Sequence, residues 1–156
     1  MIEVDIPSFR SITIENVIFD YNGTLAVDGK LINGVKEKLK ELCKKVNIYV
    51  LTADTFGTVR ENLKDLDVKV KIISKENGVV DKLRFLRELG EDRTITVGNG
   101  NNDSLMIKES ALGICVLERE GISTKALLNS DIVVKNIIDV FYMLLSTKRM
   151  IATLRE

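Results

Sequence analysis

Short apolar runs alternate with segments of helical periodicity along most of the chain. The apolar runs predict strands, and segments whose apolar residues recur every three or four positions predict helices. The predicted strands are residues 2–6, 11–14, 17–19, 47–51, 68–73, 94–97, 112–116 and 132–134. The predicted helices are residues 35–46, 55–66, 77–89, 103–109, 123–128 and 136–146.

This order of elements predicts an α/β fold with a doubly wound, Rossmann-like parallel sheet. The first two strands form a pair around Pro7 and Ser8, and from residue 17 onward strands and helices alternate. Strands that are apolar on both faces are typical of parallel sheets covered by helices on two sides. Such sheets bind ligands at the carboxyl ends of their strands, so the residues that follow each strand are the candidates for chemistry.

The helical segments also predict which side chains face the sheet. In the helix 35–46 the lysine and glutamate residues form the solvated face. In the helix 77–89 the apolar spacing predicts that Val79, Leu83 and Leu86 point inward.

The composition is that of a folded globular protein. The chain has 156 residues, of which 45% are hydrophobic and 29% are charged, and this predicts one domain over residues 1–156 with a sizeable core. Lysine plus arginine number 23, aspartate plus glutamate number 23, and the net charge is zero. This balance argues against a protein that binds nucleic acid or a membrane surface by bulk attraction.

Two residue types narrow the chemistry further. Histidine is absent, which excludes histidine-dependent catalysis and histidine-ligated metal sites. The cysteines Cys43 and Cys115 form neither a metal-binding nor a disulfide pattern, and we expect them in the core of a protein in a reducing compartment. No apolar run approaches the ~20 residues that a membrane-spanning helix needs, so we expect a cytoplasmic protein.

Polar residues follow three of the predicted strands, and a lysine lies in a predicted helix between them. The segments are Asp20-Tyr21-Asn22-Gly23-Thr24, Thr52, Lys82 and Gly98–Asp103. In a doubly wound sheet they meet at one crevice. Two carboxylates with carbonyl oxygens suit Mg²⁺, while a threonine hydroxyl and backbone N–H groups suit phosphoryl oxygens. A lysine neutralises charge during phosphoryl transfer, and an aspartate can itself attack phosphorus.

Each piece alone has a simpler explanation. Asn22-Gly23 is also a common hairpin turn, Lys82 suits a solvated helix position, and Asp103 suits a helix cap. Gly98 and Gly100 lack the third glycine of a dinucleotide-binding loop. The case for a phosphate site therefore depends on the four pieces occurring together.

Together the four segments resemble the four motifs of the haloacid dehalogenase (HAD) superfamily of phosphohydrolases, in the family's order. They are Asp20-x-Asn22-Gly23-Thr24-Leu25, Thr52, Lys82 and Gly98-x-Gly100-x-Asn102-Asp103. Within that superfamily, Leu51-Thr52-Ala53-Asp54 and the segments 111–114 and 129–133 are similar to the phosphorylation domain of P-type ATPases. The resemblance covers residues 14–150 and implies the HAD-like version of the predicted fold.

The resemblance implies a Mg²⁺-dependent phosphatase that forms an aspartyl phosphate and uses no organic cofactor. Asp20 matches the nucleophile, which is also a metal ligand. The backbone carbonyl of Asn22, the carboxylate of Asp103 and the position of Asn99 match the rest of the metal site. The implied substrate is a phosphorylated small molecule or macromolecule.

The resemblance also implies phosphate-binding roles for Thr52, Ala53, Lys82 and Asn102. Asp20, Asn22, Thr52 and Lys82 then form the catalytic set. The segment 24–32, with a turn at Asp28-Gly29, matches the flap beside the nucleophile.

Two positions depart from the family pattern. Asn22 stands where most members have an aspartate that acts as general acid and base. Because a positioned acid–base group contributes ~10²–10⁴-fold, this loss predicts slow hydrolysis and a long-lived aspartyl phosphate. Asn99 stands where many members have a first acidic metal residue, which predicts weaker binding of Mg²⁺.

The spacing of the motifs leaves no room for a cap domain. The intervals from Asp20 to Thr52 and from Thr52 to Lys82 are filled by predicted elements. A nucleotide-binding insert and membrane helices are missing too, which argues against an ion pump. The resemblance implies that capless members act on macromolecules or close their sites by forming oligomers.

Other functions stay open. A phosphoryl-binding regulatory module with little or no turnover is the main alternative, and Asn22 and Asn99 favour it. A response-regulator receiver has Asp, Thr and Lys at its strand ends, but its acidic pair ahead of the phosphorylated aspartate is missing here. A purely structural α/β domain would leave four ordered motifs unexplained. We expect the C-terminal segment 137–156 to pack on the sheet edge through Phe141 and Leu144, with self-association as the alternative.

Overall fold

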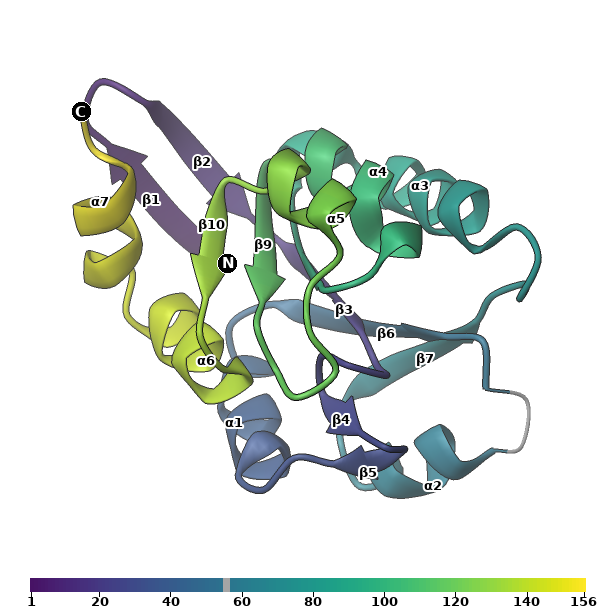
Figure 1. The fold of residues 1–156 in the computed structure, drawn as a ribbon. Helices are drawn as coiled ribbons and strands as arrows, with labels where there is room; N and C mark the ends of the chain where they lie inside the picture. Colours follow the sequence, from purple (N-terminus) through teal and green to yellow (C-terminus); the bar gives the residue numbers. More distant parts are fainter. Residues whose placement is uncertain (55–56) are drawn as a thin grey trace.

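The computed structural model describes residues 1–54 and 57–156, which contain a central sheet of six parallel strands (Figure 1). In spatial order the strands are β10 (Ile132–Val134), β9 (Leu112–Val116), β8 (Thr94–Gly98), β3 (Asn16–Asp20), β6 (Asn47–Thr52) and β7 (Val68–Ile72). The strand order reverses at β3, which lies between β6 and β8. This is the doubly wound arrangement, so the predicted α/β class and parallel sheet are confirmed. The single domain over residues 1–156 stays a prediction.

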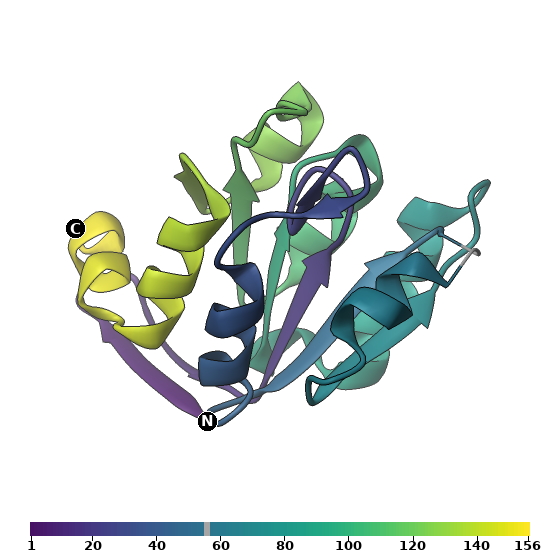
Figure 2. The same cartoon turned by 90° about the horizontal axis from the view of Figure 1, so that it is seen from below.

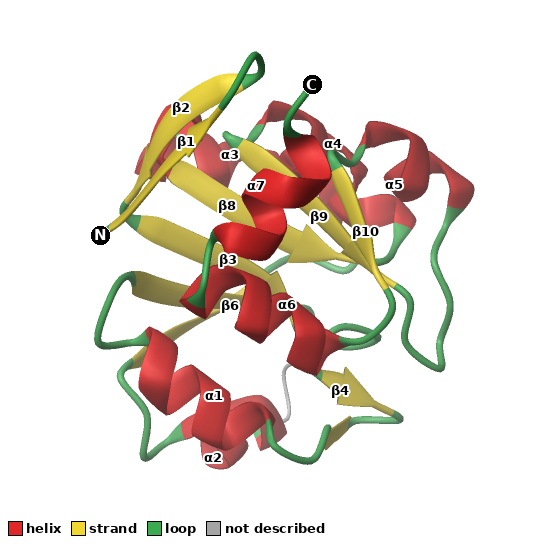
Figure 3. Ribbon diagram, turned by 90° about the vertical axis from the view of Figure 1, so that its left-hand side faces the viewer, coloured by secondary structure: helices red, strands yellow, loops and turns green. Residues whose placement is uncertain are grey.

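Helices cover both faces of this sheet (Figures 2 and 3). One face carries α1 (Val35–Leu42), α6 (Ile137–Leu145) and α7 (Lys148–Leu154), and the other carries α3 (Gly78–Leu89), α4 (Ser104–Glu109) and α5 (Thr124–Asn129). The central strand explains why both faces are needed. Val17 and Phe19 belong to the apolar cluster under α1 and α6, while Ile18 belongs to the cluster under α3 and α4.

The first two strands form a separate antiparallel hairpin, as the sequence predicts. β1 (Ile2–Ile6) pairs with β2 (Arg10–Ile14), and the burial of β1 alternates along the strand. Helix α7, which the sequence pattern did not single out, packs beside β1 and buries Met150.

A second, shorter hairpin stands over the carboxyl end of the sheet. It consists of β4 (Ala26–Val27) and β5 (Lys30–Leu31), joined by Asp28 at φ 51° and Gly29 at φ 75°. Two consecutive positive φ angles are typical of tight hairpin turns. The turn predicted at Asp28-Gly29 is therefore confirmed.

Three details of the helices differ from the prediction. α1 ends at Leu42, although Val46 beyond it is still buried. α2 spans Thr58–Leu63, and the predicted start of this helix at Thr55 lies outside the described residues. In α3 the buried positions are Gly78, Lys82, Phe85 and Leu86, whereas Val79 and Leu83 are only half-buried. The buried face of α3 is therefore rotated relative to the predicted one, because it includes the side chain of Lys82.

The strand β7 forms one edge of the sheet. Its half-buried residues Val68, Val70 and Ile72 alternate with the exposed Lys69 and Lys71. The other side of the sheet ends at β10, which has only three residues.

Both cysteines are free. Cys115 is buried on β9, and burial raises the pKa of its thiol to about 11. Burial also raises the pKa of the half-buried Cys43 thiol. Both thiols are therefore protonated at neutral pH, as expected for packing residues.

Candidate functional site

The candidate site lies where the central strands end. β3 ends at Asp20, β6 ends at Thr52 and β8 ends at Gly98, and β3 is hydrogen-bonded to both of the others. Because parallel strands end on one side of the sheet, the three turns that follow are neighbours. This is the crevice that the sequence predicts at the switch point of the strand order.

Lys82 joins two of these turns. Its side chain is fully buried, and its ammonium Nζ lies 2.6 Å from Asp20 Oδ1 and 2.5 Å from Asp103 Oδ1. It also donates to Asn102 Oδ1 at 3.4 Å. All three ammonium protons thus have an oxygen partner, which is what a buried cation requires. Helix α3 is the source of this lysine, one turn after the helix begins at Gly78.

The second carboxylate, Asp103, is held by backbone groups. Its Oδ2 accepts hydrogen bonds from the N–H groups of Asn99 at 3.0 Å and Gly100 at 2.9 Å. A Cβ atom on Gly98 would lie 2.5 Å from the Asp103 carboxyl carbon. Glycine is therefore required at position 98, because any side chain there would displace the carboxylate.

The cluster of Asp20, Lys82 and Asp103 contains two carboxyl groups but only one ammonium group. Burial raises the pKa of Asp20 to about 7, and the neighbouring Asp103 charge adds to this, while Lys82 opposes it. Burial lowers the pKa of Lys82, but the charges of Asp20 and Asp103 outweigh this effect and raise it overall. The ammonium therefore stays charged, and it faces two carboxylates.

This charge balance is the test of whether a divalent cation fits. Asp20 and Asp103 present hard oxygen donors, which Mg²⁺ prefers, and a second cation would relieve the repulsion between them. Among the described residues, no cluster of three or more Asp, Glu, Cys or His side chains could hold a metal ion. A magnesium ion here would therefore depend on two carboxylates, carbonyl oxygens and water, which is a common set for this ion.

Thr52, Ala53 and Asn22 lie to one side of the lysine cluster. Thr52 is buried and its Oγ1 accepts a hydrogen bond from the N–H of Asp54 at 3.1 Å. Asn22 and Ala53 line an open cavity of about 370 Å³. The cavity is also lined by Tyr21, Gly29, Asp54, Thr58 and Lys75. No hydrogen bond joins Lys82 to Thr52, Ala53 or Asn22 in the described residues, but β3, which ends at Asp20, pairs directly with β6, which ends at Thr52.

Asn99 and Asn102 both lie on the turn after β8, but in different settings. Asn102 is exposed and reaches Lys82. The Asn99 amide is engaged at both ends, because its Oδ1 accepts from Thr24 Oγ1 at 3.4 Å and its Nδ2 donates to the carbonyl of Gly121 at 3.0 Å. Sequence reasoning missed Gly121, since only the fold brings it near the site.

The flap hairpin is held by the same loop. The backbone N–H of Asp28 at its tip donates to Glu120 Oε1 at 3.0 Å. Glu120 carried no signal in the sequence, because it lies in the loop between β9 and α5, far along the chain from the flap.

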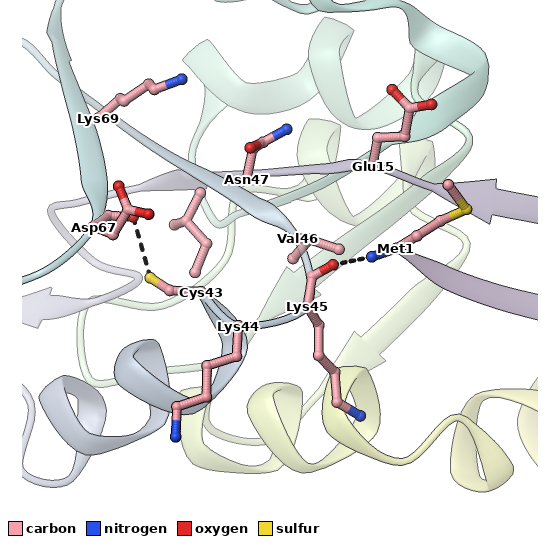
Figure 4. A pocket seen from close by; sticks show the side chains of 10 residues that line it. Met1, Glu15, Cys43, Lys44, Lys45, Val46, Asn47, Asp67 and Lys69 are labelled. Atoms are coloured by element: carbon pink, nitrogen blue, oxygen red, sulfur yellow. Dashed lines mark hydrogen bonds between the residues drawn. The ribbon is translucent and has the colours of Figure 1, made fainter.

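Another hollow lies at the opposite end of the sheet, where β3, β6 and β7 begin (Figure 4). It has a volume of about 420 Å³ and is lined by Met1, Glu15, Ile48 and residues 43–47, 67 and 69. The Met1 amine donates to the carbonyl of Lys45 there, and the Cys43 thiol donates to the carbonyl of Asp67 at 3.2 Å. It shares no residue with the candidate site, so we assign it no part in the chemistry.

The raised pKa of Asp20 predicts how the stability of the metal-free protein depends on pH. A carboxyl with an ordinary pKa of 3.8 and a folded-state pKa of about 7 stabilises the fold fully below about pH 4. That contribution is lost as the pH rises through about 7. In urea titrations with EDTA, wild type is therefore expected to lose stability relative to Asp20→Asn between about pH 5 and pH 8. A difference that does not change with pH would contradict this.

Comparisons with known proteins identify the family. A family model of haloacid dehalogenase-like hydrolases matches residues 18–126. An uncharacterized protein of Methanocaldococcus jannaschii is 46% identical over 81 residues, which are 49% of this chain and 87% of that protein. A soluble P-type ATPase-like phosphatase of the same organism is 28% identical over 138 residues. That match covers 86% of this chain and 50% of the phosphatase.

Solved structures share the fold. The cobalt-bound deoxy-D-mannose-octulosonate 8-phosphate phosphatase of Haemophilus influenzae matches with a TM-score of 0.71 at 15% identity, covering 88% of this chain and 90% of that one. The corresponding phosphatase of Moraxella catarrhalis, in complex with magnesium, phosphate and KDO, matches with a TM-score of 0.69 at 17% identity. The latter match covers 89% of this chain and 90% of that one. No helix in residues 1–54 and 57–156 is long and apolar enough to cross a membrane.

Proposed function

The chain belongs to the haloacid dehalogenase-like hydrolases, and we propose that it is a Mg²⁺-dependent phosphatase that forms an aspartyl phosphate on Asp20. The observation that carries the proposal is the buried ammonium of Lys82, held between Asp20 and Asp103 at the carboxyl end of the sheet. A buried lysine between two carboxylates is a costly arrangement for stability alone. It suits a site that must neutralise a transferring phosphoryl group.

In the proposed first step, an Asp20 carboxylate oxygen attacks phosphorus. The new O–P bond forms as the bond from phosphorus to the leaving-group oxygen breaks, and the leaving group keeps the electron pair. Lys82 stabilises the charge on the phosphoryl oxygens, because its ammonium is 2.6 Å from the attacking side chain. Thr52 Oγ1 and the N–H of Ala53 bind the same oxygens from the side of β6.

In the second step, water attacks the phosphorus of the aspartyl phosphate, and the Asp20 carboxylate is released with inorganic phosphate as the product. The residues that would hold Mg²⁺ are Asp20, Asp103 and the backbone carbonyl of Asn22. Asn99 stands at the family's fourth metal position, but Thr24 and Gly121 engage its side-chain amide. When bound, Mg²⁺ supplies positive charge that offsets the charge developing in phosphoryl transfer. The Moraxella phosphatase, whose structure contains magnesium and phosphate, supports this choice of cation.

The cavity beside Asn22 would take the leaving group. Its volume of about 370 Å³ suits a small molecule. Asn22 lines this cavity but cannot protonate a leaving oxygen, and water must likewise lose its proton to solvent. We therefore expect fast hydrolysis only for substrates with good leaving groups, such as aryl and acyl phosphates.

The test is a panel of phosphate esters assayed with and without Mg²⁺, on wild type and on Asn22→Asp. Because Asn22 lines the leaving-group cavity, the new carboxyl is expected to speed hydrolysis of alkyl phosphates on the order of 10²-fold. Aryl phosphates, whose leaving group needs no proton, should gain much less. Asn101→Asp adds the same charge at an exposed site on the turn after β8 and serves as the control. Equal rates for wild type and Asn22→Asp on alkyl phosphates would contradict the role given to this position.

A second function is favoured by the same two asparagines. With Asn22 in place of an acid, the domain would hold a phosphoryl group without turning it over, as a regulatory module does. Beryllium fluoride with Mg²⁺ separates the two functions, because it mimics a phosphoryl group on Asp20. A trapped complex, seen as a rise in melting temperature, with no turnover on the whole panel would favour the regulatory module.

The remaining parts of the proposal concern the substrate, the partner and the cellular compartment. The substrate is a phosphorylated small molecule, with a macromolecule or a second copy of the chain as the alternative partner that completes the open site. The two free cysteines support a reducing compartment such as the cytoplasm.

A further inference from the structure

We propose that Asn99 is a positioning residue that fastens the turn after Asp20 to the loop 117–123, and that its side chain is not a metal ligand. The inference deepens the proposed function, because it assigns a role to one of the family's metal positions. The observation behind it is that both the oxygen and the nitrogen of the Asn99 side-chain amide are hydrogen-bonded to other protein groups.

The contacts of Asn99 come from three separate parts of the chain. Its side-chain Oδ1 accepts from Thr24 Oγ1 at 3.4 Å, and its Nδ2 donates to the carbonyl of Gly121 at 3.0 Å. Its backbone carbonyl accepts from the N–H of Ser123 at 2.8 Å, and its own N–H donates to Asp103 Oδ2 at 3.0 Å. Asn99 therefore links the turn after β3, the turn after β8 and the loop after β9.

Packing between Asn99 and Gly23 points the same way. A Cβ atom at position 23 would lie 2.4 Å from Asn99 Nδ2 and 2.8 Å from Oδ1. The amide thus lies directly against the backbone of Gly23, which has a φ of +80° and donates to the carbonyl of Ala26 at 2.7 Å. Movement of the amide would free the turn that follows Asp20 and Asn22.

The chemistry of the Gly121 contact explains why the residue is asparagine. A carbonyl oxygen needs a donor, and a carboxylate has none. Aspartate at position 99 would place two oxygens with partial or full negative charge about 3 Å apart. The Thr24 hydroxyl, in contrast, can donate to either side chain. The departure from the acidic family residue is therefore required by the loop 117–123.

The same loop also holds the flap. Glu120 Oε1 accepts from the N–H of Asp28 at the flap tip, while Asn99 and Thr24 fasten the flap base. Thr24 is fully buried. The hairpin β4–β5 is thus tied at both ends to one loop, and Asn99 is the link nearest the nucleophile.

The variant Asn99→Asp separates this role from metal binding, because the two roles predict opposite results. If Asn99 were a ligand, a carboxylate would bind Mg²⁺ more tightly, by about tenfold or more. If it is a positioning residue, Asn99→Asp should bind Mg²⁺ no more than about threefold more tightly than Asn101→Asp, measured by isothermal titration calorimetry. Asn101 is exposed on the same turn, and no hydrogen bond of its side chain is found in the described residues.

Hydrogen–deuterium exchange supplies the positive readout. The N–H groups of residues 23, 25 and 26 are hydrogen-bonded within the turn after β3, and the N–H of Ser123 donates to the carbonyl of Asn99. In Asn99→Asp their exchange should accelerate about tenfold or more, while the strands β3 and β8 stay protected. In Asn101→Asp their exchange should match wild type. Unchanged exchange in Asn99→Asp, or Mg²⁺ binding about tenfold tighter than in Asn101→Asp, would overturn the proposal.

A second pair of variants covers the case in which Asn99→Asp does not fold. Thr24→Val removes the hydroxyl that donates to Asn99, and Thr24→Ser keeps it. Exchange at residues 23, 25 and 26 should accelerate in Thr24→Val and return towards wild type in Thr24→Ser; equal exchange in the two would overturn the proposal. Hydrogen exchange can be measured without turnover. If the protein shows no phosphatase activity, the proposed function is wrong, but the exchange result still decides the role of Asn99.

Discussion

Lys82→Met is expected to lower the free energy of unfolding of the metal-free protein by about 3–5 kcal/mol and to abolish phosphatase activity. Lys82 is fully buried and pairs with Asp20 at 2.6 Å and Asp103 at 2.5 Å. Methionine preserves most of the side-chain volume but removes the charge, which leaves two carboxylates facing each other. Urea titration at about pH 8, with circular dichroism as the signal, measures the loss of stability.

Two further variants identify the cause of that loss. Lys108→Met changes an exposed lysine on α4 and should leave the unfolding free energy within about 0.5 kcal/mol of wild type. The double variant Lys82→Met with Asp20→Asn removes one of the facing charges and should recover much of the stability, yet stay inactive. If Lys82→Met unfolds at the wild-type urea concentration, the buried ion pairs do not stabilise the fold as described.

Asp20→Asn is expected to reduce Mg²⁺-dependent hydrolysis of an aryl phosphate by on the order of 10⁴-fold or more. The amide cannot attack phosphorus, so the covalent route is closed. The variant should also remain folded, because a neutral amide avoids the burial of a charge and the repulsion from Asp103, which together raise the pKa of Asp20 to about 7. Initial rates with a chromogenic ester measure the first effect, and thermal melting in EDTA at about pH 8 measures the second.

Asp92→Asn, at an exposed position far from the site, is the matched control and should keep wild-type rates. Incubation with a radiolabelled acyl phosphate adds an independent readout, because wild type should acquire an acid-stable label and the Asp20 variant should not. Hydrolysis by Asp20→Asn within about tenfold of wild type would rule out Asp20 as the nucleophile.

The sheet and the place of the site were predictable because both follow from local patterns. Strand 17–19 is apolar at every position, which is typical of a strand covered on both faces. Polar residues after parallel strands lie together at the carboxyl end of the sheet, and this is where β3, β6 and β8 end at Asp20, Thr52 and Gly98.

The inward face of α3 was not predictable in the same way. Apolar spacing favoured Val79 and Leu83, whereas the structure buries Lys82 between Gly78 and Phe85. A lysine is assigned to solvent unless its partners are known, and here the partners come from two other turns. Tertiary pairing therefore overrode the local pattern at the helix that carries Lys82.

The contacts of Asn99 were also out of reach of the sequence. The resemblance to the HAD superfamily assigned position 99 to the metal site, but the side-chain amide is hydrogen-bonded to Thr24 and Gly121. Neither partner is close to Asn99 in the chain, so no spacing rule connects them. The structure alone shows that this asparagine has protein partners at both ends.

The alternation of lysine and apolar residues on β7 bears on how two copies of the chain can meet. An unpaired sheet edge is a template for strand addition, and charged side chains on it are a common safeguard. Lys69 and Lys71 would face their own counterparts if two β7 edges approached, so like charges would oppose a continuous sheet across two molecules. A dimer that closes the open site is therefore not expected to form by pairing of two β7 edges, and fibril-like growth from this edge is disfavoured.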